Sequence, residues 1–257
     1  MQVWRFAVAD GDVLEAMPEW TTLTSDEHRR ARGYHFTADA RRFVTGRSAL
    51  RSVLASQLPD RPHPRAVPLA TTGQSWNDDG GRLFAGVSHA GQLVLVAVAR
   101  RPVGVDHERR RPVAVDPIVV RRLFAPAESV ALGQPGPEGD NRWPAYLRTW
   151  CRKEAVAKGL GTGLDTGAAD IDTTATTVRR AGRRTGWRVV DVDLGAGWVA
   201  AVAARGRWWT VDVLEGRHAR YGDPVSAAAS SPKQAIRSSR LSRSSGVLTT
   251  PRVNHSP

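Results

Sequence analysis

Two segments about a hundred residues apart share the same plan. Ala90–Asp106 (AGQLVLVAVARRPVGVD) and Ala196–Asp212 (AGWVAAVAARGRWWTVD) both run from Ala-Gly through an apolar stretch and an arginine-bearing turn to a second stretch that ends in Val-Asp. Apolar stretches separated by a short turn are typical of β-hairpins. The recurrence predicts a chain of two similar halves, each with one hairpin.

Each predicted hairpin follows another strand-like stretch and, before that, a helical one. The strand-like stretches are RLFAGVSH and WRVVDVDL, and the helical ones are ADARRFVTGRSALRSVLASQL and RWPAYLRTWCRKEAVAKGL. This alternation predicts an α/β (α+β) protein with two α/β halves, residues 1–104 and 105–215. Chance similarity between two pairs of strands explains the repeat about equally well.

The net charge of +12 raises nucleic acid as a partner. Residues 216–257 hold half of this excess, because they contain seven basic residues and one acidic residue, and they are rich in Ser, Arg and Pro. A segment with so few apolar residues cannot bury enough surface to fold, so we expect a disordered tail. The charge that is left suits a small polyanion or an acidic protein partner as well as a nucleic acid.

The sequence favours a soluble cytoplasmic protein. The N-terminal stretch MQVWRFAVADGDVL lacks the basic start, apolar run and cleavage site of a signal peptide. No stretch approaches the roughly 20 apolar residues needed to span a bilayer, so we expect no membrane partner. The single cysteine, Cys151, cannot form an internal disulfide, which fits a reducing compartment.

The stretch VGVDHE predicts a strand with an unusual pair of charges. Asp106 and Glu108 are two residues apart, so both carboxylates point to the same side of an extended chain, where they repel each other. His107 lies between them and points to the opposite side, which favours a packing role over a role as ligand.

The stretch WPAYLRTWCRKEAVAKG predicts a helix with a proline in its first turn and Gly159 as its C-terminal cap. On a helical wheel Glu154 and Lys158 fall inside the apolar stripe, while Arg148 and Arg152 point toward solvent. An internal ion pair would explain the two inward charges. Buried charges add little stability, however, so a functional role is the favoured interpretation.

If this helix covers the strand, three carboxylates converge: Asp106, Glu108 and Glu154. Oxygen ligands without cysteine or clustered histidine suit a hard cation, first of all Mg²⁺ and also Mn²⁺. Mg²⁺ takes six ligands and favours phosphate oxygens at its open positions, which indicates a substrate that carries phosphate.

Ser88 and His89 follow a predicted strand in FAGVSHAG. A hydrolase is one interpretation of a Ser-His pair, but neighbouring residues on a strand face opposite sides and no G-x-S-x-G turn surrounds the serine. A phosphate-binding histidine with a supporting hydroxyl fits better.

Together these residues resemble the 4'-phosphopantetheinyl transferase superfamily, in its surfactin-type branch. The two hallmark motifs, (V/I)G(V/I)D-x-E and W-x-x-KEA-x-x-K, are present at Val103–Glu108 and Trp150–Lys158, and the resemblance covers roughly Val3 to Val213. It implies a monomer of two α/β halves with pseudo-twofold symmetry. It also implies that the phosphopantetheine arm of coenzyme A moves to a serine of an apo acyl or peptidyl carrier protein, with release of adenosine 3',5'-bisphosphate.

The resemblance gives roles to particular residues of the second half. Asp106, Glu108 and Glu154 would hold Mg²⁺ against the diphosphate of coenzyme A. Glu154 would also take the proton of the incoming serine, directly or through a water. Lys158 would stabilise the charge on the diphosphate.

In the first half the resemblance implies contacts to the nucleotide. His89, with Ser88, would contact the phosphates of coenzyme A, and Arg42 and Arg47 would grip the nucleotide. An exposed basic helix face is the alternative for both arginines. Gln74 stands where many relatives have a lysine that touches coenzyme A, so an attractive charge is missing at that position.

Three questions stay open at this point. The segment Leu123–Pro126 lies where relatives dock the carrier protein. Carriers of fatty-acid, polyketide and nonribosomal peptide synthesis all remain open, although the length of the chain favours the last two. A basic nucleic-acid-binding protein, with Trp208 and Trp209 as stacking residues, is one alternative. A coenzyme A binder without turnover is another, although the intact acidic motifs argue against it.

Overall fold

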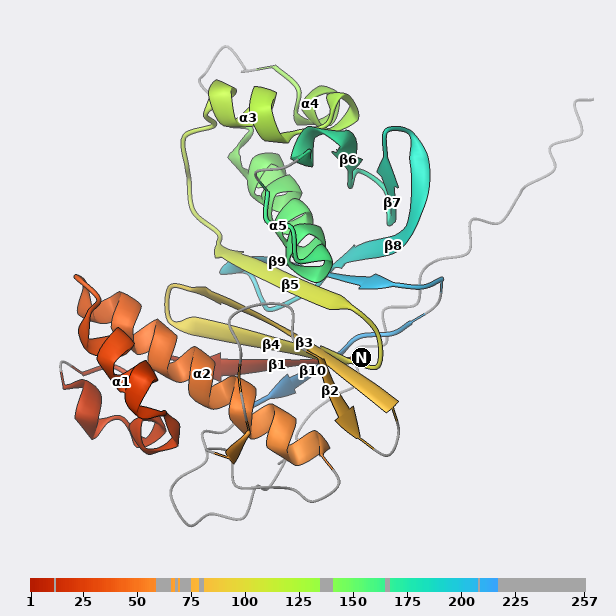
Figure 1. The fold of residues 1–257 in the computed structure, drawn as a ribbon. Coiled ribbons are helices and arrows are strands. Elements are labelled where there is room, and N and C mark those ends of the chain that lie inside the picture. The colour runs from red at the N-terminus through yellow and green to blue at the C-terminus, as the bar shows by residue number, and fades with distance from the viewer. Residues whose placement is uncertain are drawn as a thin grey trace, which may run out of the picture.

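The structure is a computed structural model that describes residues 1–11, 13–58, 66–67, 69, 75–78, 81–134, 141–164, 167–207 and 209–216. Two five-stranded sheets lie face to face at its centre, and a long helix covers the outer face of each (Figure 1). Apolar side chains of the two inner faces form one shared core. The prediction of a mixed α/β protein is therefore confirmed. The predicted tail, apart from Gly216, lies outside the described residues.

The first sheet has the strand order β10-β1-β4-β3-β2. Its strands are Gln2–Ala7 (β1), Ser75–Asp78 (β2), Gly81–Ala90 (β3), Leu93–Ala99 (β4) and Asp212–Glu215 (β10). β1 and β10 are parallel, and the other neighbours are antiparallel. Every residue of β4 is buried, because the second sheet covers one side of this strand and a helix covers the other.

The second sheet has the order β5-β9-β8-β7-β6 and is antiparallel throughout. Its strands are Val103–Arg109 (β5), Ile171–Asp172 (β6), Thr177–Arg180 (β7), Arg183–Asp191 (β8) and Trp198–Arg205 (β9). Along β5 the inward positions Val103 and Val105 contribute to the core between the sheets. The alternate residues face the helix on the outer side.

The two predicted hairpins are wrong. β4 and β5 follow each other in the chain but belong to different sheets, and so do β9 and β10. β4 instead forms a hairpin with β3, the strand directly before it, and also pairs with β1. β5 pairs with β9, which lies far along the chain. A short polar turn can either reverse the chain within one sheet or carry it into the next layer, and the local pattern of residues is the same in both cases. The two similar segments of the sequence are therefore two places where the chain passes from one sheet to the other.

These crossings bear on the predicted division at residues 104 and 105. That boundary falls inside β5, and β10 of the predicted second half pairs with β1 of the first. The last strand thus returns to the first sheet. The division into halves remains a prediction about how the chain is organised.

The α-helices are Ser25–Arg32 (α1), Thr37–Gln57 (α2), Pro117–Leu123 (α3), Pro126–Leu132 (α4) and Trp143–Leu160 (α5). In the described parts of the chain, three short 3-10 helices accompany them: Leu14–Ala16 (η1), Pro18–Thr22 (η2) and Ala168–Asp170 (η4). α2 covers the first sheet and α5 covers the second. α3 and α4 lie beside the N-terminal half of α5 (Figure 1). None of the described helices is long and apolar enough to cross a membrane.

Glycine brings α5 into close contact with β5. A Cβ atom on Gly104 would lie 2.1 Å from the backbone oxygen of Ala155, and one on Gly159 would lie 2.5 Å from the ring of Trp187. Neither position can hold a larger residue without a shift of the helix. α5 ends at Leu160, so Gly159 lies inside the helix, and the prediction that it caps the helix is wrong. The cap is Gly161, whose φ of 74° is left-handed.

The prediction that Arg152 points toward solvent is also wrong. Its guanidinium is buried, donates to the backbone oxygens of Thr173 and Ala175, and pairs with Asp191 at 2.9 Å. A helical wheel considers only the residues of one helix. It therefore could not show that Asp191, 39 residues further along the sequence, pairs with Arg152 inside the protein. Arg148 keeps a half-exposed side chain, as predicted.

Lys153 forms a second buried ion pair, which connects α5 to α4. Its Nζ lies 2.6 Å from Oε2 of Glu128, and both side chains are at most 1% exposed. Oε1 of Glu128 accepts from the backbone N–H and the hydroxyl of Thr173. Burial lowers the pKa of Lys153, and the Glu128 carboxylate counteracts that effect. The pair fixes the short helix α4 on α5.

The contact at Gly104 gives a first prediction. Gly104→Ala should lower the free energy of unfolding by about 3 kcal/mol, because the new methyl group meets backbone that cannot move aside. Gly46→Ala in α2 is the matched control, since its Cβ would lie 3.8 Å from Val87 and alanine favours a helix. Urea unfolding of both variants measures the difference. Equal stability of the two variants would contradict the tight contact.

The buried pair gives a second prediction. Lys153→Met should cost about 3 to 5 kcal/mol of unfolding free energy, because it leaves the Glu128 carboxylate buried without its cation. Adding Glu128→Gln to this variant should recover part of the loss. Arg29→Ala, which removes an exposed pair with Asp26, should cost less than about 1 kcal/mol. Chemical denaturation of all three variants tests the order.

Candidate active site

The two strand carboxylates face α5, as the sequence predicts. Asp106 is paired across the sheet with Ala201, which packs with Cys151 and Ala155 of α5. Asp106 is buried and only 5% exposed, whereas Glu108, nearer the end of β5, is half-buried. The contact at Gly104 brings β5 and α5 together two residues before Asp106. Glycine in the strand and glycine in the helix therefore position the acids against the helix.

The two oxygens of Asp106 have different surroundings. Oδ1 lies 2.6 Å from Nζ of Lys158 and accepts a hydrogen bond of 2.9 Å from the hydroxyl of Ser88. By hydrogen-bond geometry, Oδ2 is buried without a partner among the described residues. The thiol of Cys151, a weak donor, is close enough to the carboxylate of Asp106 to interact with it. A buried oxygen without a partner is costly, so one oxygen is held in place and the other is left to bind something else.

Glu108 and Glu154 add negative charge at the same place. Burial raises the pKa of Glu108 above its ordinary value, and the nearby carboxylates of Asp106 and Glu154 raise it further, while Lys158 acts in the opposite direction. Glu154 is half-buried on α5. The structure thus places Asp106, Glu154 and Lys158 within electrostatic range of Glu108, and Lys158 against Asp106.

The carboxylates of Asp106, Glu108 and Glu154 are the type of oxygen ligand that a hard cation prefers. Among the described residues, no three acidic, histidine or cysteine side chains lie close enough to hold a metal ion in the arrangement seen. The unpartnered Oδ2 of Asp106 is nevertheless an available oxygen ligand. The mutual repulsion that raises the pKa of Glu108 is what a bound cation would remove. The donor set therefore fits Mg²⁺ or Mn²⁺.

His107 is a packing residue, as the strand alternation predicts. It is 1% exposed, its Nε2 lies 3.2 Å from the backbone oxygen of Leu93, and its ring is tilted against Trp198. Burial lowers the pKa of His107 to about 3. The ring is therefore neutral at physiological pH and adds no charge beside Asp106.

His89 lies within electrostatic range of both Arg42 and Lys158. His89 is exposed at the end of β3, and desolvation lowers its pKa, together with the positive charges of Lys158 and Arg42. Arg42 donates to the backbone oxygen of Gly91 and pairs with Asp39. Imidazole and guanidinium groups both offer N–H donors that can receive phosphate oxygens.

Arg47 lies in a different environment. Its guanidinium contacts Glu27 of α1 at 2.5 Å and donates to the backbone oxygen of Leu69. Glu27 also pairs with the buried Arg51. The structure therefore places Arg47 in a network between α1 and α2 and does not show it beside His89. Gln74 lies outside the described residues.

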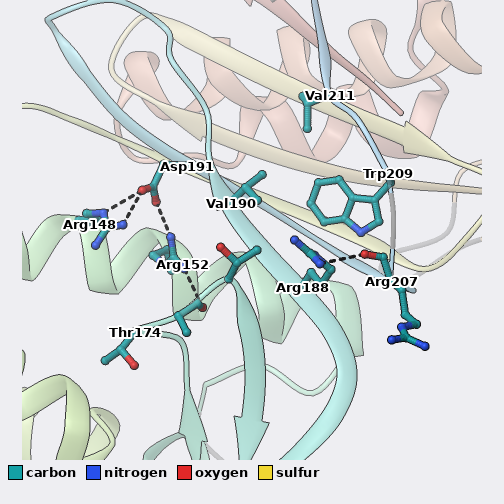
Figure 2. Close-up of a pocket in the computed structure, with 11 residues that line it drawn as sticks. Arg148, Arg152, Thr174, Arg188, Val190, Asp191, Arg207, Trp209 and Val211 are labelled. Carbon is teal, nitrogen blue, oxygen red and sulfur yellow. Dashed lines mark hydrogen bonds and ion pairs between the residues drawn. The ribbon is translucent and has the colours of Figure 1, made fainter. Parts of the chain in front are cut away.

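A pocket of about 460 Å³ lies at the edge of β8 and is shown in Figure 2. None of the eight predicted site residues, all of which the structure describes, lines it. Three of the arginines that line it already bind groups of the protein. Arg148 and Arg152 pair with Asp191, and Arg188 donates to the backbone oxygen of Arg207. The pocket is separate from the acidic site.

The segment predicted to dock the carrier protein joins α3 to α4. Phe124 and Ala125, in the predicted docking segment Leu123–Pro126, are buried at 3% exposure. Ile118 of α3 and Val130 of α4, on either side, are exposed at 61% and 81%. The exposed apolar surface therefore lies on the two helices that flank the predicted segment.

The structure describes one of the two tryptophans offered for nucleic-acid stacking. Trp208 lies outside the described residues, and Trp209 is half-buried and packs against the core between the sheets. Sequence reasoning missed Thr173 and Asp191, which hold the buried charges of α5. No local signal marks them, because each acts across a long stretch of sequence.

Known proteins are similar to this chain in sequence. Residues 102–203 match the model of the 4'-phosphopantetheinyl transferase superfamily. This range contains Asp106, Glu108, Glu154 and Lys158.

Individual relatives extend the similarity beyond that range. The 4'-phosphopantetheinyl transferase HetI of Nostoc sp. is 31% identical over 194 residues, which cover 73% of this chain and 81% of HetI. A putative 4'-phosphopantetheinyl transferase of Synechocystis sp. is 31% identical over 58% of this chain and 61% of its own. The 4'-phosphopantetheinyl transferase Sfp of Bacillus subtilis is 24% identical over 55% of this chain and 62% of its own. The chain therefore belongs to the 4'-phosphopantetheinyl transferase superfamily and is a transferase of this type.

Proposed function

We propose that this enzyme moves the phosphopantetheine arm of coenzyme A onto a serine of an apo acyl or peptidyl carrier protein, with a divalent cation held by Asp106, Glu108 and Glu154. The observation that supports this most is the buried, unpartnered Oδ2 of Asp106 beside two further carboxylates. A bound Mg²⁺ or Mn²⁺ would neutralise the diphosphate and make its phosphorus more electrophilic.

Glu154 is the proposed base of the reaction. It takes the proton of the carrier serine, directly or through a water, as the serine oxygen attacks the phosphorus next to the pantetheine. The new bond joins that oxygen to phosphorus, and the bond to the adenosine 3',5'-bisphosphate breaks. The position of Glu154 on α5, within electrostatic range of Glu108, supports this role.

Lys158 is proposed to change partner when the substrate binds. In the structure its ammonium pairs with Oδ1 of Asp106 at 2.6 Å. A divalent cation beside Asp106 would supply the positive charge there, so Lys158 could turn toward the diphosphate and stabilise its developing charge. The side chain is 34% exposed, which leaves room for that movement.

We propose that His89 and Arg42 bind the phosphates of the nucleotide. The position of His89 within electrostatic range of Arg42 and Lys158 supports this contact. Arg47 remains a weaker candidate, because its ion pair with Glu27 would have to open first.

The proposed partner is a carrier protein of polyketide or nonribosomal peptide synthesis. The exposed Ile118 and Val130 offer apolar contacts near the N-terminal half of α5, and the net charge of +12 suits an acidic partner. We further propose a monomer in the cytoplasm. The buried thiol of Cys151, whose pKa burial raises, is inert toward disulfide formation.

Intact-mass spectrometry tests the reaction. With coenzyme A and Mg²⁺, the protein should add one phosphopantetheine mass to apo peptidyl or acyl carrier proteins. Glu154→Gln should slow the transfer by about 100-fold to 10,000-fold, because the amide cannot accept the proton. Glu215→Gln removes an exposed carboxylate on β10 and should leave the rate unchanged. The proposal fails if no carrier in a panel of both types gains mass.

Removal of divalent cations tests the cation site. After treatment with EDTA the transfer rate should fall to background, and excess Mg²⁺ or Mn²⁺ should restore it. Asp106→Asn should need more Mg²⁺ to reach half of its maximal rate, because the amide is a weaker ligand. Full activity in EDTA would contradict a role for the cation.

A further inference from the structure

Ser88 does not lie where a ligand of the nucleotide would be expected. It is 3% exposed, and its side chain points away from His89, the neighbouring residue that reaches solvent. Its hydroxyl donates to Oδ1 of Asp106 at 2.9 Å and accepts from the backbone N–H of His107 at 3.3 Å. Its contacts are thus with the strand that carries the acids.

These hydrogen bonds join the two sheets. Ser88 belongs to β3 of the first sheet, and Asp106 belongs to β5 of the second. Gly86 lets the strands approach closely, since a Cβ there would lie 3.3 Å from the backbone of Gly104. Ser88 follows two residues later on the same side of β3. The serine therefore reaches Asp106 from a rigid neighbouring strand.

The hydroxyl of Ser88 has a single proton and two possible acceptors. Oδ1 of Asp106 is one, and Nδ1 of His107, at 3.1 Å, is the other. Nε2 of His107 faces the backbone oxygen of Leu93, which can only accept, so this nitrogen carries a ring proton. A carboxylate is a stronger acceptor than an imidazole nitrogen, so the serine proton points toward Asp106.

We propose that Ser88 is a positioning residue for the divalent cation. It holds Oδ1 of Asp106, so that the carboxylate cannot rotate and Oδ2 stays directed to the cation. Residues that support metal ligands through hydrogen bonds commonly change the affinity for the metal about 10- to 100-fold. This inference rests on the proposed function, because it takes Asp106 as a cation ligand.

The inference gives Ser88 and His89 separate roles, which variants can distinguish. In Ser88→Ala, binding of Mn²⁺ in the presence of coenzyme A should weaken about tenfold or more, as measured by the electron paramagnetic resonance of free Mn²⁺. Affinity for adenosine 3',5'-bisphosphate without metal, measured by calorimetry, should stay within about twofold of the wild-type value. His89→Ala should show the opposite pattern.

Ser88→Cys keeps the volume of the buried side chain and replaces a good donor with a weak one. It carries the test if Ser88→Ala fails to fold, and circular dichroism checks both variants. Wild-type affinity for Mn²⁺ in the folded variants, with loss of affinity for the bisphosphate, would overturn the inference and make Ser88 a phosphate ligand. If the wild-type protein binds no Mn²⁺, the proposed cation site fails as well, so the two failures are distinguishable.

Discussion

The contact between β5 and α5 at Gly104 and Gly159 is the constraint on which the site depends. Backbone touches backbone there, since a single added carbon on Gly104 would lie 2.1 Å from the helix. From that contact onward the strand and the helix run close together, which brings Asp106 toward Lys158 and Glu108 toward Glu154. Larger residues would hold the helix away from the sheet, and the acids would no longer share one space.

Burying Asp106 is costly, and the surrounding structure offsets that cost only in part. Lys158 and Ser88 satisfy one oxygen, while the other has no described partner. By contrast, the buried carboxylate of Glu128 has both oxygens satisfied, by Lys153, Thr173 and backbone groups. Two buried acids of the same fold thus differ in one respect. The complete set of partners at Glu128 is expected of a structural ion pair, and the incomplete set at Asp106 is expected of a binding site.

Local sequence patterns predicted the elements well and their connections poorly. Alternation of side chains placed Asp106 and Glu108 on one side of β5 and His107 on the other, and the helical wheel placed Glu154 and Lys158 toward the strand. These are properties of a single element. The crossing from β4 to β5 depends on which strands pair, and the short turn between them does not encode that choice. The burial of Arg152 likewise depends on Asp191, a partner far along the chain.

Lys158 links the acids, Asp106, Glu108 and Glu154, to His89 and Arg42. Lys158 lowers the pKa of Glu108 and of His89, so it lies within range of both groups of charges. Without a ligand the ammonium balances Asp106. A cation and a polyanion that arrive together would neutralise the acids and the bases at the same time, while either one alone would leave one side uncompensated. The arrangement is therefore consistent with joint binding of a cation and phosphate, as the proposed transfer from coenzyme A requires.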